Sequence, residues 1–182
     1  MSVSQTDVTI PTGTWEIDPS HSTVGFVARH LMVSKVRGRF ASYQATIKIA
    51  DDPLQSSVVV TIDAASIDTR DDNRDAHLRS PDFLDVEQYP TLTFESTAVR
   101  AAGEDYEVDG NLTIRDVTRP VTLQLEFTGV QDAFGGTRAG FGAVTKFSRK
   151  DFGLTWNAAL EGGGWVVGDN VTIELEIEAV KK

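Results

Sequence analysis

The sequence contains no cysteine, which excludes both disulfide bonds and thiolate chemistry. Residues 1–13 show no basic stretch, no apolar run and no small-residue cleavage site, the three features of a secretory signal. No later apolar run reaches the length of about 20 residues that a membrane-spanning helix requires. These absences predict a cytoplasmic protein that is not integrated into a membrane.

Basic residues are scarce, because 17 Lys and Arg stand against 27 Asp and Glu and give a formal net charge of −10. An acidic surface repels phosphate backbones and anionic lipid headgroups, so we expect neither a nucleic-acid partner nor membrane docking driven by charge. Enzyme signatures are also missing, since the sequence has no G-x-S-x-G, P-loop, G-x-G-x-x-G or H-E-x-x-H motif. We therefore predict no catalytic residues, whereas an uncharged apolar ligand is compatible with this composition.

The dominant pattern that is present is an alternation of apolar and polar residues. In one run Val121, Leu123 and Leu125 alternate with Thr122 and Gln124, as in an antiparallel strand with one buried and one wet face. Eight such runs are predicted, near residues 14–30, 36–50, 56–68, 91–100, 105–115, 120–130, 137–150 and 169–181. The length of 182 residues suits one domain. We expect a single domain over residues 1–182, of which 1–12 form a flexible N-terminal segment.

Residues 70–90 interrupt this pattern with a polar, charge-rich stretch that lacks alternation. Ser80 followed by Pro81 is typical of a helix N-cap and a first helical residue, and Pro90 ends whatever precedes it. The stretch predicts one or two short helices, mostly within residues 73–88. The side chains expected to pack on the sheet are Phe83, Leu84, Val86 and Tyr89.

Eight long antiparallel strands could form a sandwich or a closed barrel, and closure is favoured because it removes exposed edges. Strands of about 12 residues, tilted by about 40°, would give a bore roughly 30 Å long, which suits a long thin ligand. A filled core would show the same periodicity, but small residues such as Gly25, Gly38, Ala98 and Gly142 favour a cavity. The inward phases predict ligand-binding residues at Val24, Phe26, Ala28, His30, Phe40, Tyr43, Val58, Val60, Phe94, Phe141 and Phe147.

Three histidines, His21, His30 and His77, could in principle form a three-ligand zinc site. His21 and His30 are nine positions apart, so on one unbroken strand they would face opposite sides and lie about 30 Å apart. Local hydrogen bonds are the simpler interpretation of each ring, and we predict no metal. His21 is expected to anchor the first strand near the barrel rim, and His30 to meet the polar head of a ligand.

Five segments that together cover most of the chain resemble one known family. They are TWEIDPSHSTVGFVARHLMVSKVRGRF at 14–40, IDTRDDNRDAHLRSPDFLDVEQYPTLTFES at 67–96, YEVDGNLTIRDVTRPV at 106–121, RKDFGLTWN at 149–157 and VGDNVTIELEIEAV at 167–180. They are similar to the YceI-like family of lipocalin-like, polyisoprenoid-binding barrel proteins. The resemblance implies an all-β fold: an extended eight-stranded antiparallel barrel with a short helical insert, a long lipid in its bore and no enzymatic activity.

The resemblance also implies the class of ligand, an isoprenoid chain such as a polyprenyl or quinone tail, and no other cofactor. The sequence departs from the family in two respects. Many members have glycine where Asp116 stands, although aspartate tolerates the same left-handed turn. Many members are exported, whereas no signal peptide is seen in this sequence.

Three hypotheses about function follow. The first, which the resemblance favours, is a lipid-binding protein that holds the isoprenoid chain for transport, storage or sequestration, either alone or as a homodimer. The second is an enzyme that acts on a hydrophobic substrate in the barrel, with His30 or an inward acid as the base. No set of nucleophile, base and orienting residue supports it. The third is a ligand-free structural or stress-response barrel.

Overall fold

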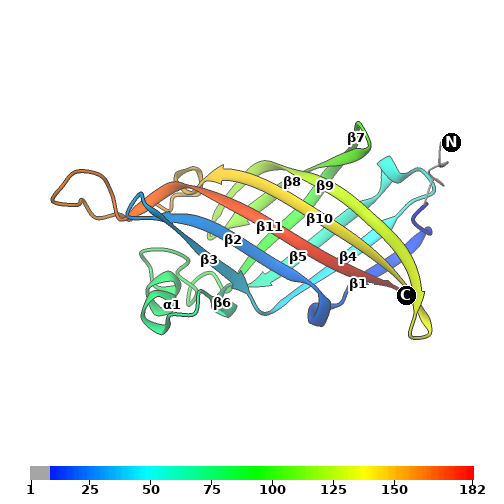
Figure 1. Ribbon diagram of the computed structural model, residues 1–182, viewed down its shortest axis with the longest axis horizontal. Coiled ribbons are helices and arrows are strands. Elements are labelled where there is room, and N and C mark those ends of the chain that lie inside the picture. The colour runs from blue at the N-terminus through cyan, green and yellow to red at the C-terminus, as the bar shows by residue number, and fades with distance from the viewer. Residues whose placement is uncertain (1–8) are drawn as a thin grey trace.

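The computed structural model describes residues 9–182 and is a long antiparallel β-barrel with one short helix (Figure 1). Its strand segments are β1 (Gly13–Ile17), β2 (Thr23–His30), β3 (Ser34–Phe40), β4 (Tyr43–Ile49), β5 (Ser57–Asp63), β6 (Ile67–Asp68), β7 (Thr91–Ala102), β8 (Asp105–Ile114), β9 (Val117–Ala133), β10 (Gly136–Ser148) and β11 (Val167–Lys181). The helix is α1 (Asp72–Arg79), and the short 3₁₀ turns are η1 (Pro19–His21), η2 (Pro53–Gln55), η3 (Ala64–Ser66) and η4 (Arg149–Phe152). This composition confirms the predicted all-β fold class.

The sheet closes on itself. Neighbouring strands follow the order β1-β4-β5-β7-β8-β9-β10-β11, and β11 returns to β1, where Trp15 is paired with Lys181. A ring of eight antiparallel strands excludes the sandwich and confirms the barrel. The first three predicted strands are each divided, into β1 and β2, β3 and β4, and β5 and β6, and the other five are continuous.

The break in the first strand has a local cause. Asp18 caps η1 by accepting a hydrogen bond from the backbone N–H of Ser20, and Pro19 fixes the first residue of the turn. Beyond the break, β2 pairs with β11 and β3. Within residues 9–182, β3 is paired on its far edge at Arg39 and Phe40 alone. Along the rest of β3 this edge is unpaired within the described residues, whereas β2 stays beside β11 (Figure 1).

The helical insert begins and ends elsewhere than predicted. Asp71 is the N-cap of α1 and accepts a hydrogen bond from the backbone N–H of Arg74, and acidic residues in the first turn favour this start. Ser80 is the C-cap, and its hydroxyl donates to the His77 carbonyl, so its prediction as an N-cap was wrong. Residues 81–90 form turns rather than a second helix. Phe83 and Leu84 are buried as predicted, while Val86 and Tyr89 are half-buried.

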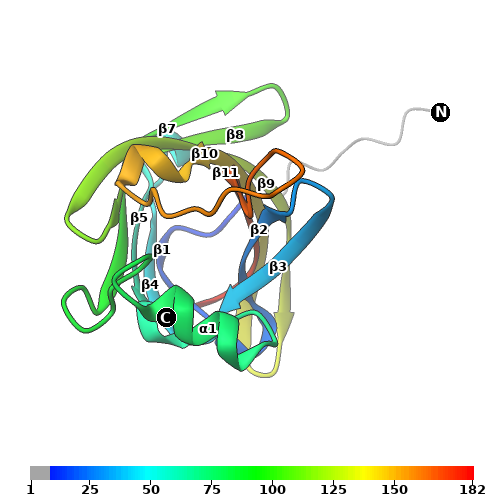
Figure 2. The same cartoon turned by 90° about the vertical axis from the view of Figure 1, so that its left-hand side faces the viewer.

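The long strands of the ring run between two ends of the barrel. One end carries Ile10, η2 and the hairpin turns at 103–104 and 134–135. The opposite end carries the hairpin turn at 31–33 and the segments 64–90 and 149–166, and α1 lies across it (Figure 2). We call these the open end and the closed end, because of the cavity described below. Among residues 9–182 no helix is long and apolar enough to cross a membrane.

The N-terminal segment is partly fastened to the barrel. Residues 1–8 of the predicted flexible segment 1–12 lie outside the described residues. The Trp15 indole donates to the Pro11 carbonyl at 3.0 Å, and the Thr12 hydroxyl donates to Asp51 at 2.9 Å. Ile10 packs against the buried cluster around Trp15. The last residues of the segment therefore belong to the wall of the open end.

Candidate ligand-binding cavity

A cavity of about 220 Å³ runs along the inside of the barrel. Every strand of the ring contributes to its wall, because alternate side chains of each strand point inward. The lining residues are Ile10, Ile17, Val24, Phe40, Ile47, Ile49, Pro53, Ser56, Ser57, Val58, Val60, Ile62, Leu92, Phe94, Val99, Tyr106, Val108, Leu112, Ile114, Val121, Leu123, Leu125, Phe127, Phe141, Ala143, Thr145, Phe147, Ile173, Leu175 and Ile177.

The wall of this cavity is apolar almost throughout. No lining residue within 9–182 carries a charge, and the polar ones are hydroxyl-bearing: Ser56, Ser57, Tyr106 and Thr145. A charged group placed here would lose its hydration without gaining a partner, at a cost of several kcal/mol or more. The cavity therefore selects apolar guests and excludes ionic ones.

The cavity reaches the surface at the open end. Pro53 and Ser57 line it there and are exposed to solvent, and Ile10 and Ser56 beside them are half-buried. The Ser56 hydroxyl accepts a hydrogen bond from the Ala50 backbone N–H at 3.1 Å. The entrance thus combines small hydroxyl-bearing residues with the edge of an apolar wall.

At the closed end the cavity is stopped by a group of buried side chains that we call the plug: Leu84, Phe152 and Leu154. They belong to the same buried cluster as the lining residues Val24, Phe40, Ile62 and Ile114. The ring of Phe152, which is 1% exposed, lies 5.0 Å from that of the lining residue Phe147. The cavity is therefore a tube that is open at one end.

Two sets of contacts hold the plug in place. Arg149 is 3% exposed, and its Nη1 donates to the carbonyls of Leu154 at 2.7 Å and Trp156 at 2.8 Å. Burial lowers the pKa of the Arg149 guanidinium, an effect that the Asp169 carboxylate opposes. The Trp156 ring in turn lies 4.6 Å from the His77 ring. The segments 64–90 and 149–157, which are far apart in the sequence, are joined in this way.

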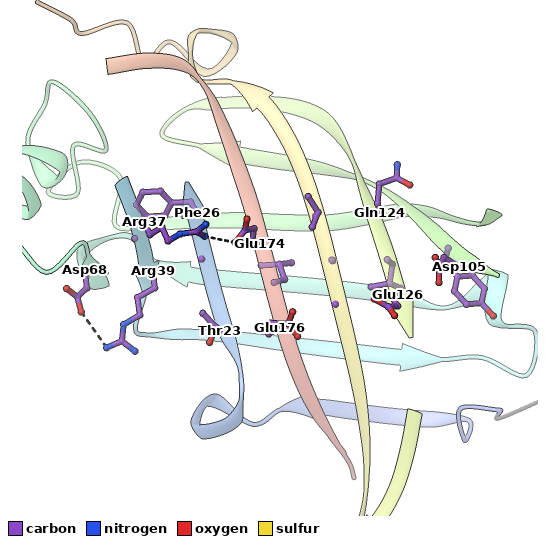
Figure 3. Close-up of a pocket in the computed structure, with 18 of the residues that line it drawn as sticks. Thr23, Phe26, Arg37, Arg39, Asp68, Asp105, Gln124, Glu126, Glu174 and Glu176 are labelled. Atoms are coloured by element: carbon purple, nitrogen blue, oxygen red, sulfur yellow. Dashed lines mark hydrogen bonds and ion pairs between the residues drawn. The ribbon is translucent and has the colours of Figure 1, made fainter. Parts of the chain in front are cut away.

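A second and larger hollow, of about 770 Å³, lies on the outside of the barrel across β3, β2, β11, β10 and β9 (Figure 3). Gly25 and Gly142 leave its floor open, and its walls carry both signs of charge. Arg37 and Glu174 are paired across it at 3.1 Å, as are Arg39 and Asp68 at 3.4 Å. This outer groove is wide and charged, so the enclosed tube is the better candidate for an apolar ligand.

A family model for the YceI-like domain matches residues 15–179. The chain belongs to the YceI-like family. The UPF0312 protein of Vibrio cholerae serotype O1 is 38% identical over 168 residues, which are 90% of this chain and 84% of that protein. Protein YceI of Salmonella newport is 42% identical over 137 residues, 74% of this chain and 72% of the relative.

Solved structures share the fold of this YceI-like barrel. BcnA of Burkholderia cenocepacia is 27% identical, with a TM-score of 0.77 over 89% of this chain and 98% of that one. The YceI protein of Campylobacter jejuni is 28% identical, with a TM-score of 0.71 over 100% and 96%. A polyisoprenoid-binding domain from Saccharophagus degradans is 18% identical, with a TM-score of 0.69 over 92% and 98%. At that identity the last likeness concerns the fold alone.

Seven of the eleven predicted ligand-binding residues line the tube of the YceI-like barrel. They are Val24, Phe40, Val58, Val60, Phe94, Phe141 and Phe147. Their positions agree with the inward phases of their strands, and their contact with a ligand stays a prediction. The outward residue Val59, between two of them, is 49% exposed, as the alternation requires.

The other four predicted residues lie elsewhere. Phe26 covers Gly38 with its ring, at the place where a side chain on Gly38 would stand, and packs beside Phe40 at 5.9 Å. Ala28 and His30 are on the last part of β2, where it pairs with β3 and β11, and neither lines the tube. Tyr43 packs against the buried cluster of the closed end. Burial and the nearby Asp18 carboxylate raise the pKa of the Tyr43 hydroxyl, which has no hydrogen-bond partner within residues 9–182.

Two features of the wall escaped the sequence pattern. A bulge between Ser96 and Ala98 shifts the register of β7 against β8, so Val99 lines the tube and Ala98 is exposed, opposite to the predicted phase. Gly25 and Gly142 hollow the outer groove rather than the tube. A run such as Ser96-Thr97-Ala98, with no large apolar residue, is the only signal that a bulge could interrupt the alternation.

The histidines act locally. His21 belongs to η1, where its Nδ1 lies 3.1 Å from Asp18, and His77 Nε2 lies 2.9 Å from Asp82. Ligand atoms of Asp18, His21 and Glu178 come within 4.8 Å of one another, as a metal site would need. Arg138 already places its guanidinium there, 2.9 Å from Asp18 and 2.6 Å from Glu178. A metal ion would have to displace this cation.

Arg138 also explains the electrostatics of this cluster. Hydrogen bonds from Ser20, then Arg138 and His21, hold the pKa of the Asp18 carboxyl well below its usual range. The carboxylates of Asp18 and Glu178 in turn raise the pKa of Arg138. The expected anchoring of the first strand near the rim is thus performed mainly by Asp18 and Arg138, with His21 as a contributor.

Proposed function

We propose that this YceI-like barrel binds a long apolar lipid of the isoprenoid class in its tube, for transport, storage or sequestration. The observation that carries the proposal is the wall itself, which is continuous along the barrel and free of charge at every lining residue within 9–182. The polyisoprenoid-binding domain from Saccharophagus degradans has the same fold, which supports the idea that a barrel of this kind can hold such a chain.

The dimensions of the tube favour a thin chain over a compact ligand. Its volume of about 220 Å³ is below the roughly 300–1,000 Å³ of pockets for drug-sized molecules. The thirteen residues of β10 span about 35 Å along the axis at about 3.4 Å per residue and a tilt of about 40°. Each buried CH₂ contributes about 0.8 kcal/mol, so a long chain needs few specific contacts.

The asymmetry of the tube gives the ligand an orientation. The tail would lie against the plug, near Phe147 and Ile114, and the polar head would stay at the open end, near Ser56 and Ser57. A wall of this type discriminates poorly between chains that differ by one methylene. We therefore expect a range of chain lengths rather than one defined lipid.

The enzyme hypothesis is weaker because the wall offers hydroxyls without a base. Thr145 and Tyr106 line the tube, but no histidine or carboxylate lines it within residues 9–182, and His30 is outside this lining. A hydroxyl that no neighbouring base activates is a poor nucleophile. A cytoplasmic location, a homodimer and the nature of the head group stay predictions.

The test uses two neighbouring valines on opposite faces of β5. Val58 lines the tube and Val59 is 49% exposed on the outside. Wild type, Val58→Asp and Val59→Asp are purified under native conditions, and the organic extract of each is analysed by mass spectrometry. We expect a co-purified isoprenoid in wild type and Val59→Asp, and its loss from Val58→Asp, because an unpartnered carboxylate would stand in the tube.

An extract without lipid from all three proteins, together with no uptake of added polyprenol by the wild type, would favour the ligand-free barrel. Equal lipid content in Val58→Asp and Val59→Asp would place the ligand outside the tube.

A further inference from the structure

The closed end carries an exposed group of four side chains, Leu31, Met32, Val33 and Trp165, which we call the apolar tip. Val33 is 79% exposed, Met32 58% and Trp165 54%. The tip comes from two hairpins, at 31–33 and 158–166, which are joined by a 2.9 Å hydrogen bond from the Leu31 backbone N–H to the Val166 carbonyl. Both hairpins project from the closed end, and they lie side by side (Figures 1 and 2).

The backbone of the β2–β3 turn is strained by the residues that occupy it. Leu31 and Met32 have φ values of 53° and 63°, the left-handed region that costs an ordinary residue about 1–2 kcal/mol. A two-residue hairpin turn of this geometry favours Asn-Gly or Asp-Gly. The turn at the open end has the related pair Phe134 and Gly135, in which glycine relieves one position. The large apolar residues of the tip are therefore not there for the stability of the turn.

Two positive charges stand directly behind the tip. Arg29 and Lys35 are exposed cross-strand neighbours on β2 and β3, and like charges in that position repel each other. Neither has an ion-pair partner within residues 9–182. The chain contains no Asp or Glu between residues 19 and 50 but five Lys and Arg. In the 158–166 hairpin Glu161 is the one acidic residue.

We propose that the apolar tip inserts into the surface of an anionic lipid membrane, with Arg29 and Lys35 against the headgroups. The free protein is destabilised by the exposed apolar side chains, by the strained turn and by the unpaired like charges. An anionic membrane would cover the apolar side chains and neutralise the like charges. A tryptophan beside aliphatic residues suits the boundary between headgroups and acyl chains. Anionic headgroups would contribute about 1 kcal/mol, a factor of about five in affinity, for each basic residue at the surface.

The overall charge of −10 does not oppose this arrangement. Exposed charges interact over about 8 Å at physiological salt, so the basic residues near the tip decide the local potential at the closed end. The proposed function supplies the reason for contact, because an insoluble isoprenoid has to be collected from or delivered to a bilayer. The inference rests on it for that reason alone, and membrane binding is measurable whether or not the tube holds a lipid.

The experiment is sedimentation of the full-length protein with vesicles of phosphatidylcholine, with and without about 30% phosphatidylglycerol. We expect binding to the anionic vesicles that weakens as salt is added. The principal variant is the double substitution Leu31→Asn and Met32→Gly, which removes two side chains of the tip and gives the turn its preferred residues. Its melting temperature should stay equal or rise, while vesicle binding falls at least tenfold.

The matched control for the apolar side chains is Phe134→Ser at the open end, where Phe134 is 93% exposed on a comparable hairpin; its vesicle binding should equal that of wild type. The matched pair for charge is Lys35→Glu and Lys48→Glu, both at exposed positions of acid-free strands. Lys35→Glu should weaken binding by about five- to thirtyfold, and Lys48→Glu should leave it unchanged.

Three results would overturn the proposal. They are absence of binding to either vesicle, equal binding to both compositions, and equal loss in Phe134→Ser and the double variant. Self-association that the double variant abolishes, without vesicle binding, would assign the tip to a second copy of the chain instead. Lipid content is scored separately: binding by the tip with an empty tube would leave this inference standing and remove the proposed function.

Discussion

The two ends of the barrel differ in how their charged and apolar side chains are arranged. At the open end, charges are paired: Arg138 joins Asp18 and Glu178, and Lys182 lies 2.6 Å from Glu16. At the closed end, the interior is filled by the plug, while the surface keeps Arg29 opposite Lys35 and the strained turn of Leu31 and Met32. The open end has a conventional surface, and the closed end has an unusual one.

The plug and the entrance also differ in how deeply their residues are buried. Plug residues are among the most buried of the chain, whereas the entrance is formed by exposed or half-buried residues such as Pro53 and Ser56. Substitutions in the plug should therefore be costly, as should those in the buried cluster around Trp15. The exposed residues of the entrance should tolerate change, and the apolar tip should even gain stability from it.

The largest effect is expected from Phe152→Ala. Phe152 is 1% exposed and packs edge-on against Phe147, so its removal leaves a cavity and should lower the free energy of unfolding by about 3–5 kcal/mol. Phe127→Ala, on the half-buried wall of the tube, should cost only about 1–2 kcal/mol. Urea unfolding of both variants provides the measurement. Equal losses would mean that the tube is as tightly packed as the plug.

Next comes Arg149→Met, which keeps much of the side-chain volume but removes the donors to Leu154, Trp156 and Gly168. The carbonyls left without partners should lower the free energy of unfolding by about 3 kcal/mol. Hydrogen exchange should show faster opening of residues 153–166 than in wild type. Unchanged exchange there would show that the segment is held by its ring contacts alone.

A smaller effect concerns pH and the open end. The folded pKa of Asp18 is depressed, so its contribution to stability is complete above the unfolded value of about 3.9 and is lost as the pH falls below it. Asp18→Asn should therefore be less stable than wild type at pH 7, and the difference should shrink as the pH falls from about 4 towards 2. Thermal melts across this range test the sign. A difference that grows on acidification would contradict it.

The smallest effect is expected from chelators. The guanidinium of Arg138 occupies the position between Asp18 and Glu178 that a cation would take. We expect the melting temperature of purified protein to be the same with and without EDTA. A drop of several degrees after chelation would indicate a metal ion that stabilises the folded state by binding.

Much of the barrel followed from local pattern. The alternation along 120–130 and 137–150 correctly gave the inward phase of Leu123 and Phe141, because a strand with one buried face has a side-chain period of two. The pattern failed where backbone geometry changes that period. The bulge at Ser96–Ala98 and the turn capped by Asp18 each depend on a partner strand or a single cap, which periodicity does not report.

The helix boundaries failed for a related reason. Ser80-Pro81 and Asp71-Asp72 are both acceptable helix starts, and the hydrogen bonds from Arg79 to the carbonyls of Ala65 and Ile67 fix the helix end against η3 and β6. Those contacts exist only in the folded chain. His30 was misplaced because the strand predicted as continuous is broken at η1, and the end of its second half, β2, does not line the tube.

The sequence by itself determined antiparallel strands that each have one apolar, uncharged face, since binary patterning alone specifies which face of a strand is buried. Only the tertiary structure decided that these strands close into a ring rather than a sandwich, and that the interior is a tube open at one end. The plug joins Leu84 to Phe152 and Leu154, which are separated in the sequence by the four strands β7 to β10. Closure of the ring decides which of these distant segments come into contact. The alternation within a single strand carries no information about such contacts.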